Sequence, residues 1–367
     1  MRSLSKVLLL LLTASLMISA AGCNYKFAED EGQYIIDAEA AAGYVGKAGS
    51  VIVDMQKPED YAKAHIKGAV NIPLAEIVIN TPAPNMLAPK AQIEAVLGSK
   101  GIANDTMVII YDNNKNMEAA RMWWTLRIYG HETVRVISGG FNALQAARLE
   151  MTAEAPAAAV SKYTAKDINT SMLATIDEVK ALANQPQQNV ILLDTRTKEE
   201  FDQETIPGSV LFDYSENNYN DGTYKKVQDI KIQYIENKIT PDKAIMMYCK
   251  TSVRAAQTYL ALYNAGYRNM KIYDGAWLEW EASTKPQAAP VEAAQPAAPS
   301  APAVQEAQPA NNTAAPAATT EAKPENKPEE SKPTEPEKQA PVQAAPQPTP
   351  QPTPPPAPVE SDNSDNS

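Results

Sequence analysis

The stretch Ala244-Ile245-Met246-Met247-Tyr248-Cys249-Lys250-Thr251-Ser252-Val253-Arg254 decides the fold of this chain. Its first five residues are a short apolar run, which predicts a buried strand. A loop follows Cys249, and a helix is expected to begin near Val253. Because open α/β sheets place ligand crevices at the carboxyl ends of their strands, Cys249 is expected to lie in such a crevice.

The same pattern occurs twice in the chain. The expected strands are Ser50–Asp54, Met107–Tyr111 and Val134–Ile137 in the first copy, and Val190–Asp194, Ala244–Tyr248 and Met270–Tyr273 in the second. Helices are expected from Pro58 to His65, over Lys198–Gln203, around Trp124 and around Leu260. Alternating strands and helices predict the α/β class, with two parallel sheets that helices cover on both faces. We expect the domains at residues 35–155 and 166–284.

The N-terminus has the pattern of an export signal. Arg2 and Lys6 precede an apolar run, and small residues lead to Cys23. Ala-Ala-Gly-Cys resembles a bacterial lipoprotein box, so residues 1–22 are predicted to be a signal peptide and Cys23 a lipidation site, followed by a linker at 23–34. The expected location is extracytoplasmic, on a bacterial cell membrane through a lipid anchor. The alternative is an ordinary secretory signal.

Residues 285–367 have a different composition, rich in Pro and Ala and without aromatic side chains. Such a tail is predicted to stay disordered, as a spacer or as a segment that contacts the cell wall or a protein. The net charge of −11 gives no reason to expect nucleic-acid binding. With two histidines, at 65 and 131, a zinc cluster is not expected, and no cofactor is predicted.

Several motifs in the correct order resemble the rhodanese family in its tandem sulfurtransferase form. They are Asp194-Thr195-Arg196, Glu200-Phe201, Ile206-Pro207-Gly208, Asn220-Asp221-Gly222-Thr223-Tyr224, Tyr248-Cys249 to Arg254, and Tyr273-Asp274-Gly275-Ala276-Trp277. The resemblance implies two rhodanese-like domains, a catalytically silent first and an active second. It also implies transfer of a sulfane sulfur through a persulfide on Cys249. In the first copy, Asn113 or, with a loop one residue longer, Asp112 stands opposite Cys249.

The expected site residues surround this cysteine. Cys249 is the predicted nucleophile, because loop amides and the helix N-terminus can stabilise its thiolate. The predicted substrate-binding residues are Arg196, Lys250, Thr251, Ser252, Val253 and Arg254. Arg254 is expected to fix the loop more than to touch the donor, and an ion pair of Arg196 with Glu200 or Asp194 is the alternative to donor binding. Lys250 either steers anions or is solvated. Trp277 and Trp280 are expected in the core, and Trp123 and Trp124 in the core or at the domain interface.

The partners are a small anionic sulfur donor and a thiol or cyanide-like acceptor. Thiosulfate is favoured over 3-mercaptopyruvate, because no arginine follows Phe201 to clamp a carboxylate. Phosphatases and arsenate reductases that share the fold have five residues between Cys and Arg, and this loop has four. A surface binding module without catalysis is the remaining alternative.

Overall fold

The computed structural model describes residues 25–157 and 159–285. The predicted signal peptide, Cys23 and nearly all of the predicted tail lie outside the described residues. Within the described part, two parallel five-stranded sheets have matching strand orders, β1-β8-β7-β2-β4 and β10-β14-β13-β11-β12. The expected α/β class with two rhodanese-like sheets is confirmed.

The first sheet contains β1 (Ile35–Ile36), β2 (Ser50–Asp54), β4 (Val70–Asn71), β7 (Met107–Tyr111) and β8 (Val134–Ile137). The second contains β10 (Leu173–Ala174), β11 (Val190–Asp194), β12 (Val210–Leu211), β13 (Ala244–Tyr248) and β14 (Met270–Tyr273). The predicted central strands are found with the expected bounds. Each is an apolar run buried on both faces, which is the pattern of parallel sheets.

Helices cover both faces of each sheet. In the first half they are α2 (Ala38–Ala41), α3 (Pro58–Tyr61), α4 (Lys90–Ser99), α5 (Met117–Ile128) and α6 (Gly140–Ala146). In the second half they are α7 (Ile176–Asn184), α8 (Lys198–Gln203), α9 (Val227–Glu236), α10 (Val253–Asn264) and α11 (Ala276–Thr284). The hairpin strands β5 (Val78–Ile79) and β6 (Met86–Leu87) complete the part that positions the site.

The helix expected from Pro58 to His65 is shorter than predicted. It ends at Tyr61, and His65–Ile66 forms β3, which pairs antiparallel with β9 (Met151–Thr152). The apolar spacing could not show this, because the partner strand lies far away in the sequence.

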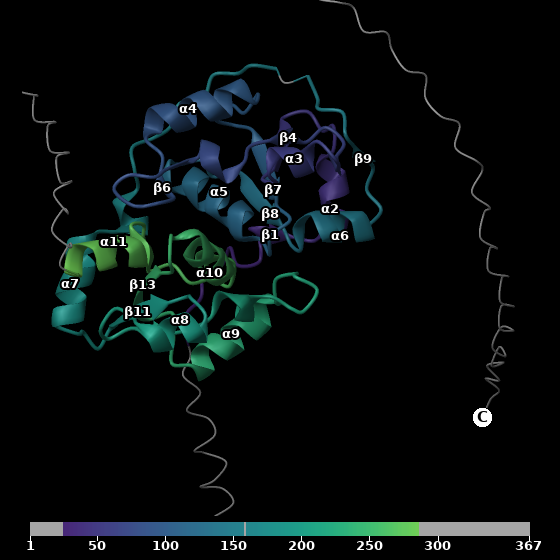
Figure 1. Cartoon of the computed structure of the whole chain (residues 1–367). Coiled ribbons are helices and arrows are strands. Elements are labelled where there is room, and N and C mark those ends of the chain that lie inside the picture. The colour runs from purple at the N-terminus through teal and green to yellow at the C-terminus, as the bar shows by residue number, and fades with distance from the viewer. Residues whose placement is uncertain (1–24, 158, 286–367) are drawn as a thin grey trace, which may run out of the picture. The chain divides into compact units, whose positions relative to one another are not determined.

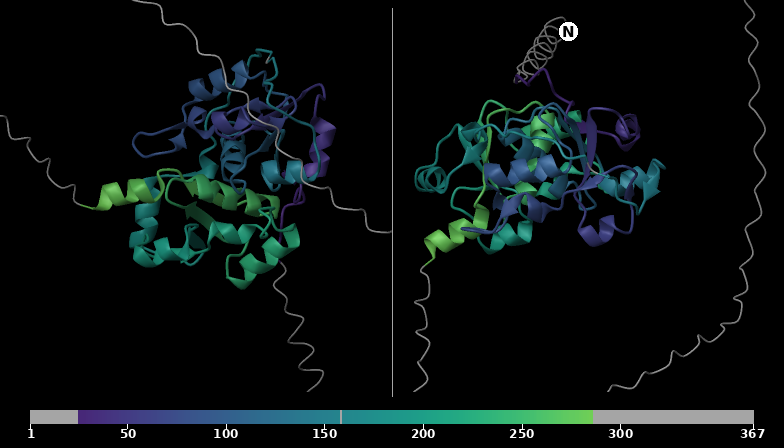
Figure 2. Two further views of the ribbon diagram at one scale, coloured as in Figure 1. Left: turned by 45° about the vertical axis from the view of Figure 1, so that its right-hand side comes forward. Right: turned by 90° about the horizontal axis from the view of Figure 1, so that it is seen from above.

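The two halves share one hydrophobic core. Helices α5 and α10 pack against each other, and Figure 1 shows them on the facing sides of the two domains. The left view of Figure 2 shows the same arrangement, with the blue elements of the first half against the green elements of the second. Trp123 is fully buried there and has edge contacts with Tyr34 and Tyr263. The expectation of a core or interface position for Trp123 and Trp124 is therefore confirmed.

A buried tyrosine at the end of the central strand ties each sheet to the following turn. The Tyr248 hydroxyl donates to Asp194 at 2.9 Å and accepts the amide of Ile206 at 3.1 Å. In the first half, the Tyr111 hydroxyl donates to Asp54 at 2.5 Å and accepts the amide of Ile66 at 3.1 Å. The duplicated network places the residue after each tyrosine, which is Cys249 in the second half, at the same point of the fold.

We expect Tyr248→Phe to lower the free energy of unfolding by about 1–3 kcal/mol, because it leaves buried polar partners without a hydrogen bond. Urea unfolding of the full chain measures the change. Tyr219→Phe is the matched control, since Tyr219 is 39% exposed, and it should change the value by less than about 0.5 kcal/mol. Equal effects of the two substitutions would contradict the role of the buried network.

Candidate active site

Cys249 is the first residue after β13 and lies at the carboxyl end of the sheet. Its side chain is buried, with 1% of its surface exposed. The chain then turns through Lys250 and Thr251 to Ser252, which has a left-handed φ of 67° and starts α10. The carbonyl of Cys249 accepts the amide of Trp277 at 3.0 Å, so the loop after β14 also holds the cysteine in place. The thiol therefore lies between the end of a strand and the start of a helix, as predicted.

Arg254 is clamped beside this thiol. Its Nη1 and Nη2 atoms donate to the two carboxylate oxygens of Glu200 at 2.5 and 2.9 Å. Burial opposes the charge of Arg254, but hydrogen bonds to Glu200 and the interaction with the Cys249 sulfur outweigh it and raise its pKa. The guanidinium also lies 5.7 Å from the Tyr214 ring. Arg254 is thus a cation that Glu200 fixes near the sulfur, and it is more than a solvated loop residue.

Arg196 has a carboxylate partner of its own. Its Nε atom lies 3.0 Å from each oxygen of Asp194, and Nη2 lies 2.7 Å from Oδ2 of the same residue. Nη2 also donates to the carbonyl of Glu204 at 2.6 Å, and the guanidinium lies 4.6 Å from the Trp277 ring. Since these contacts use most of its donors, the ion pair with Asp194 is the main interaction of Arg196 in this structure.

A pocket of about 220 Å³ lies next to the catalytic loop. Its lining residues are Arg196, Glu200, Gln203, Glu204, Lys250, Trp277 and Glu281. Trp277 was expected in the core and is indeed 7% exposed, yet it also lines this pocket. Lys250 is exposed, and no ion pair is described for it within residues 25–157 and 159–285. The pocket therefore presents the exposed ammonium group of Lys250 beside Arg196, which Asp194 neutralises, and three glutamates.

The middle of the loop faces the first half of the chain. The hydroxyl of Thr251 accepts a hydrogen bond from Nδ2 of Asn85 at 3.2 Å. Ser252 is fully buried, and its hydroxyl donates to the carbonyls of Tyr273 and Asp274. Val253 is buried at the start of α10. These contacts hold the loop, and none of these three residues lines the pocket.

The corresponding loop of the first half carries no thiol. Asp112 stands in the place of Cys249, because its carbonyl accepts the amide of Phe141 at 2.8 Å as that of Cys249 accepts Trp277. The Asp112 carboxylate accepts the amides of Asn114, Asn116 and Ala119 at 2.9, 3.0 and 2.9 Å. Of the two alternatives that the sequence left open, the loop one residue longer is therefore the observed one.

The first loop carries a carboxyl group at the position that corresponds to Arg254 of the second loop. Glu118 stands at the position of Arg254, in the first turn of α5. Burial, followed by the charge of Asp112, raises the pKa of Glu118 to about 7. Two carboxyl groups thus occupy the place of a thiol and a guanidinium. The first copy therefore has neither a thiol that could form a persulfide nor a cation at the position of Arg254.

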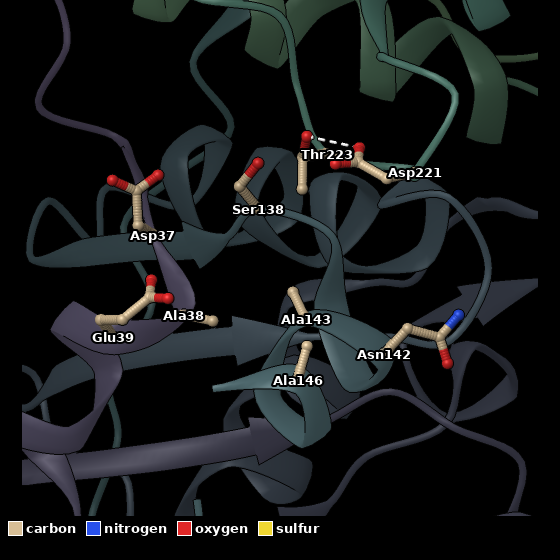
Figure 3. A pocket seen from close by; sticks show the side chains of 9 residues that line it. All are labelled: Asp37, Ala38, Glu39, Ser138, Asn142, Ala143, Ala146, Asp221 and Thr223. Atoms are coloured by element: carbon tan, nitrogen blue, oxygen red, sulfur yellow. Dashed lines mark hydrogen bonds between the residues drawn. The ribbon is translucent and has the colours of Figure 1, made fainter. Parts of the chain in front are cut away.

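A separate pocket of about 400 Å³ lies away from Cys249, where a loop of the second half reaches the first half (Figure 3). Asp37, Glu39 and Asp221 contribute carboxylates to it. The Thr223 hydroxyl donates to Asp221, and Ser138 lies close by. Its acidic lining and its lack of a nucleophile separate it from the sulfur chemistry.

Several residues around the loop were not predicted as functional from the sequence. Glu200 was part of a motif, but its role as the clamp of Arg254 was not foreseen. Asn85 contacts the loop across the domain interface, Arg121 crosses the interface to Asp274 beside the loop, and Tyr214 comes from a neighbouring turn. No periodicity or spacing in the sequence signals contacts between segments so distant.

The clamp predicts a pH dependence of stability. Hydrogen bonds from Arg254 lower the pKa of Glu200 from 4.5 to about 2. A lowered folded-state pKa stabilises the protein above pH 4.5, and this contribution is lost as the pH falls toward 2. Glu200→Gln should therefore lower the free energy of unfolding at pH 7 and lose this effect progressively below pH 4.5. Urea unfolding at pH 7, 4.5 and 3 measures the difference; a difference independent of pH would contradict the ion-pair assignment.

Comparisons with known proteins show which family the chain belongs to. The chain is 30% identical over 246 residues to the thiosulfate sulfurtransferase of Bos taurus, covering 62% of this chain and 81% of the relative. It is 29% identical over 249 residues to the thiosulfate sulfurtransferase of Mus musculus, covering 63% and 82%. The crystal structure of the 3-mercaptopyruvate sulfotransferase SseA of Escherichia coli matches with a TM-score of 0.59 at 24% identity, covering 66% of this chain and 98% of that one.

The anaerobic ergothioneine biosynthesis enzyme of Chlorobium limicola has the same fold, with a TM-score of 0.61 at 19% identity over 68% of each chain. The model of the rhodanese-like domain matches residues 37–147 and again residues 175–283. The two copies of sheet, loop and helix described above fall within these spans. The chain therefore belongs to the rhodanese-like domain family, with two copies of the domain.

Proposed function

We propose that the protein is a sulfurtransferase that moves the sulfane sulfur of thiosulfate to a thiophilic acceptor through a persulfide on Cys249. The observation that carries this proposal is the buried Cys249 thiol beside Arg254, a cation held in place by both oxygens of Glu200. A fixed cation next to a thiol favours the thiolate, which is the reactive form. The thiosulfate sulfurtransferases of Bos taurus and Mus musculus support the same assignment.

The reaction needs two displacements at sulfur. In the first, the Cys249 thiolate attacks the outer sulfur of thiosulfate, a new S–S bond forms, and sulfite leaves with the electron pair of the broken S–S bond. In the second, cyanide or a thiolate attacks the outer sulfur of the persulfide and regenerates the Cys249 thiolate. Such double displacement gives ping-pong kinetics.

The silent loop shows what this type of loop can stabilise. Around Asp112, three backbone amides converge on a carboxylate. Amides arranged in this way favour a negative charge without a metal ion. In the second half no carboxylate fills the equivalent space, so the corresponding amides of the Cys249 loop are available to a thiolate or persulfide. This supports the expected stabilisation of a sulfur anion.

One cation beside Cys249 supports a small inorganic donor. Arg196 and Arg254 are each paired with a carboxylate, and the pocket-lining Glu204 and Glu281 are both paired with Lys285, so Lys250 is the pocket-lining cation that remains exposed. A single ammonium group attracts a dianion to the entrance. The second arginine clamp that a 3-mercaptopyruvate carboxylate calls for is not found among the described residues that line this pocket. That keto acid remains the alternative donor, on the strength of the family resemblance.

The loop length argues against phosphoester or arsenate chemistry. Four residues separate Cys249 from Arg254, and Arg254 interacts with the sulfur and with Glu200. A tetrahedral oxyanion needs a wider ring of donors than a single sulfur atom does. We therefore infer sulfur transfer as the activity of this loop.

Cys249→Ser should abolish conversion of thiosulfate and cyanide to thiocyanate by the full chain, because the persulfide cannot form on a hydroxyl. Mass spectrometry of the unaltered protein after thiosulfate treatment should show the gain of one sulfur on the peptide that contains Cys249. Thiosulfate, 3-mercaptopyruvate and a phosphoester should be compared on one preparation. Unchanged thiocyanate production by Cys249→Ser would remove Cys249 from the mechanism, and faster turnover of 3-mercaptopyruvate would reverse the order of donors.

We further propose that Cys23 is lipidated and anchors the protein to the outer side of a bacterial cell membrane. The support is the sequence Ala20-Ala21-Gly22-Cys23 after a charged and apolar N-terminus. Among the helices that the structure describes, none is long and apolar enough to cross a bilayer. The segment at 285–367, whose composition is that of a spacer, is proposed to contact the cell wall or another protein.

Cys23→Ala should move the protein from the membrane fraction to the soluble fraction of cells that express the full chain, because the acyl chains attach to this cysteine. Fractionation followed by immunoblotting measures the distribution. Cys249→Ala is the control, since it removes the other cysteine and should leave the membrane fraction unchanged. Full membrane retention of Cys23→Ala would exclude lipidation as the anchor.

A further inference from the structure

Arg121, on helix α5 of the first half, contacts two residues that each hold the Cys249 loop, Asp274 and Asn85. It is fully buried and lies 2.7 Å from Oδ1 of Asp274 through its Nη2 atom. The same Nη2 atom donates to the carbonyl of Asn85 at 2.9 Å. Asn85 in turn donates to the hydroxyl of Thr251 in the catalytic loop. One guanidinium group of the silent half thus connects two routes to the loop that carries Cys249.

The second route passes through Asp274, directly after β14. Its Oδ2 atom accepts the amide of Leu87 at 2.6 Å, so the domain interface fixes its side chain. Its backbone carbonyl accepts the hydroxyl of Ser252. Because Ser252 has the left-handed conformation that turns the loop into α10, this carbonyl supports the residue that shapes the loop. Asp274 therefore joins the silent half to the turn beside Cys249.

The equivalent contact beside the Asp112 loop of the first half contains no charged side chains. There Ser138 occupies the place of Asp274 after the matching strand β8, and its hydroxyl accepts the amide of Tyr224 at 2.8 Å. Gln257 occupies the place of Arg121 on α10 and bonds to Asn217 and Asn218 of its own half. Figure 3 shows Ser138 beside the loop that contains Thr223. Both contacts close the interface, but only the one beside Cys249 has a buried ion pair.

Interface stability alone does not call for this charge. Burying an ion pair has a desolvation cost, and neutral residues of similar size often stabilise a protein equally well. Nε and Nη1 of Arg121 and Oδ1 of Asp274 add to the cost, because they are buried and have no described hydrogen-bond partner, so the pair is held by charge alone. The contact between Ser138 and Tyr224 shows that this fold closes the same interface with neutral groups. The ion pair therefore has a purpose on the catalytic side beyond holding the domains together.

We propose that Arg121 is a positioning residue for sulfur transfer: through Asp274 and Asn85 it fixes the loop from Cys249 to Ser252 in its reactive shape. The silent domain thereby sets the reactivity of the Cys249 thiol, in addition to packing against the active domain. This inference rests on the proposed sulfur transfer at Cys249. It assigns Arg121 no contact with the donor.

The decisive variant is the double substitution Arg121→Gln with Asp274→Ser, which installs the neutral pair of the silent side. It removes both charges together, so no unpaired charge remains buried, and the thermal midpoint should stay close to that of the parent. The parent is the full chain with Cys23→Ser, which leaves Cys249 as the sole thiol of the two cysteines. We expect kcat for thiosulfate and cyanide to fall on the order of 10- to 100-fold, because small misplacements have such effects.

Two further readouts separate positioning from a structural effect. KM for thiosulfate should change less than about twofold, because the donor does not touch Arg121. The rate at which iodoacetamide alkylates Cys249 at a fixed pH of about 7 should fall, because a loosened loop no longer holds the sulfur in its reactive position. Arg121→Lys, which keeps the charge opposite Asp274, should restore part of kcat relative to the double variant.

Asn116→Ser is the matched control, since it removes the hydrogen bond of the silent loop to the carbonyl of Gly222 at 2.8 Å. Its kcat should stay within about twofold of the parent.

A folded double variant with the kcat and alkylation rate of the parent would overturn the proposal. If the double variant does not fold, Asn85→Ala tests the other route: kcat should fall on the order of fivefold, and an unchanged kcat would overturn the proposal. A parent without thiosulfate activity would refute the proposed function, while the alkylation rate would still test the role of Arg121.

Discussion

The packing of α5 against α10 is the constraint on which the rest of the structure depends. These helices follow the two equivalent loops, and they are buried in one hydrophobic core that both halves share. The start of α10 carries Arg254, and α5 carries Arg121. Because the core fixes one helix against the other, the silent half lies against the back of the catalytic loop. The positions of Asn85, Asp274 and the thiol all follow from this packing.

The two loops show how one backbone device takes opposite electrostatic roles. In the first half, Asp112 supplies its own negative charge to the converging amides, and Glu118 adds a second carboxyl. In the second half, a thiol replaces the carboxylate and Arg254 replaces Glu118. In the first copy, the loop amides therefore donate to the carboxylate of Asp112 itself. In the second copy, the equivalent amides remain available for a sulfur anion. The duplicated fold is retained, but only the second loop carries a thiol.

The structure also changes the view of the cations around the thiol. The sequence predicted Arg196, Lys250 and Arg254 around the thiol, with Arg254 mainly fixing the loop and Arg196 either binding the donor or pairing with a carboxylate. In the fold, Asp194 binds Arg196 and Glu200 binds Arg254, so two of these charges are fixed and neutralised. Lys250 remains exposed at the pocket. The feature that distinguishes the Cys249 loop from the first loop is that Glu200 holds the guanidinium of Arg254 rigidly near the sulfur; the total positive charge around the thiol is less important.

The sequence by itself determined the sheets, the repeat and the position of Cys249 directly after a central strand. Apolar runs such as Val190–Asp194 and Ala244–Tyr248 predict buried parallel strands, and the chain order fixes Cys249 at a strand end, because these patterns are local. Only the tertiary structure decided which carboxylate binds Arg196. It also decided that helix α3 ends at Tyr61, so that His65–Ile66 can form β3, and that Asn85 contacts the loop while Arg121 holds Asp274 beside it. These contacts join residues from separate elements or opposite domains, and their geometry depends on how the shared core packs. No local pattern in the sequence encodes that packing.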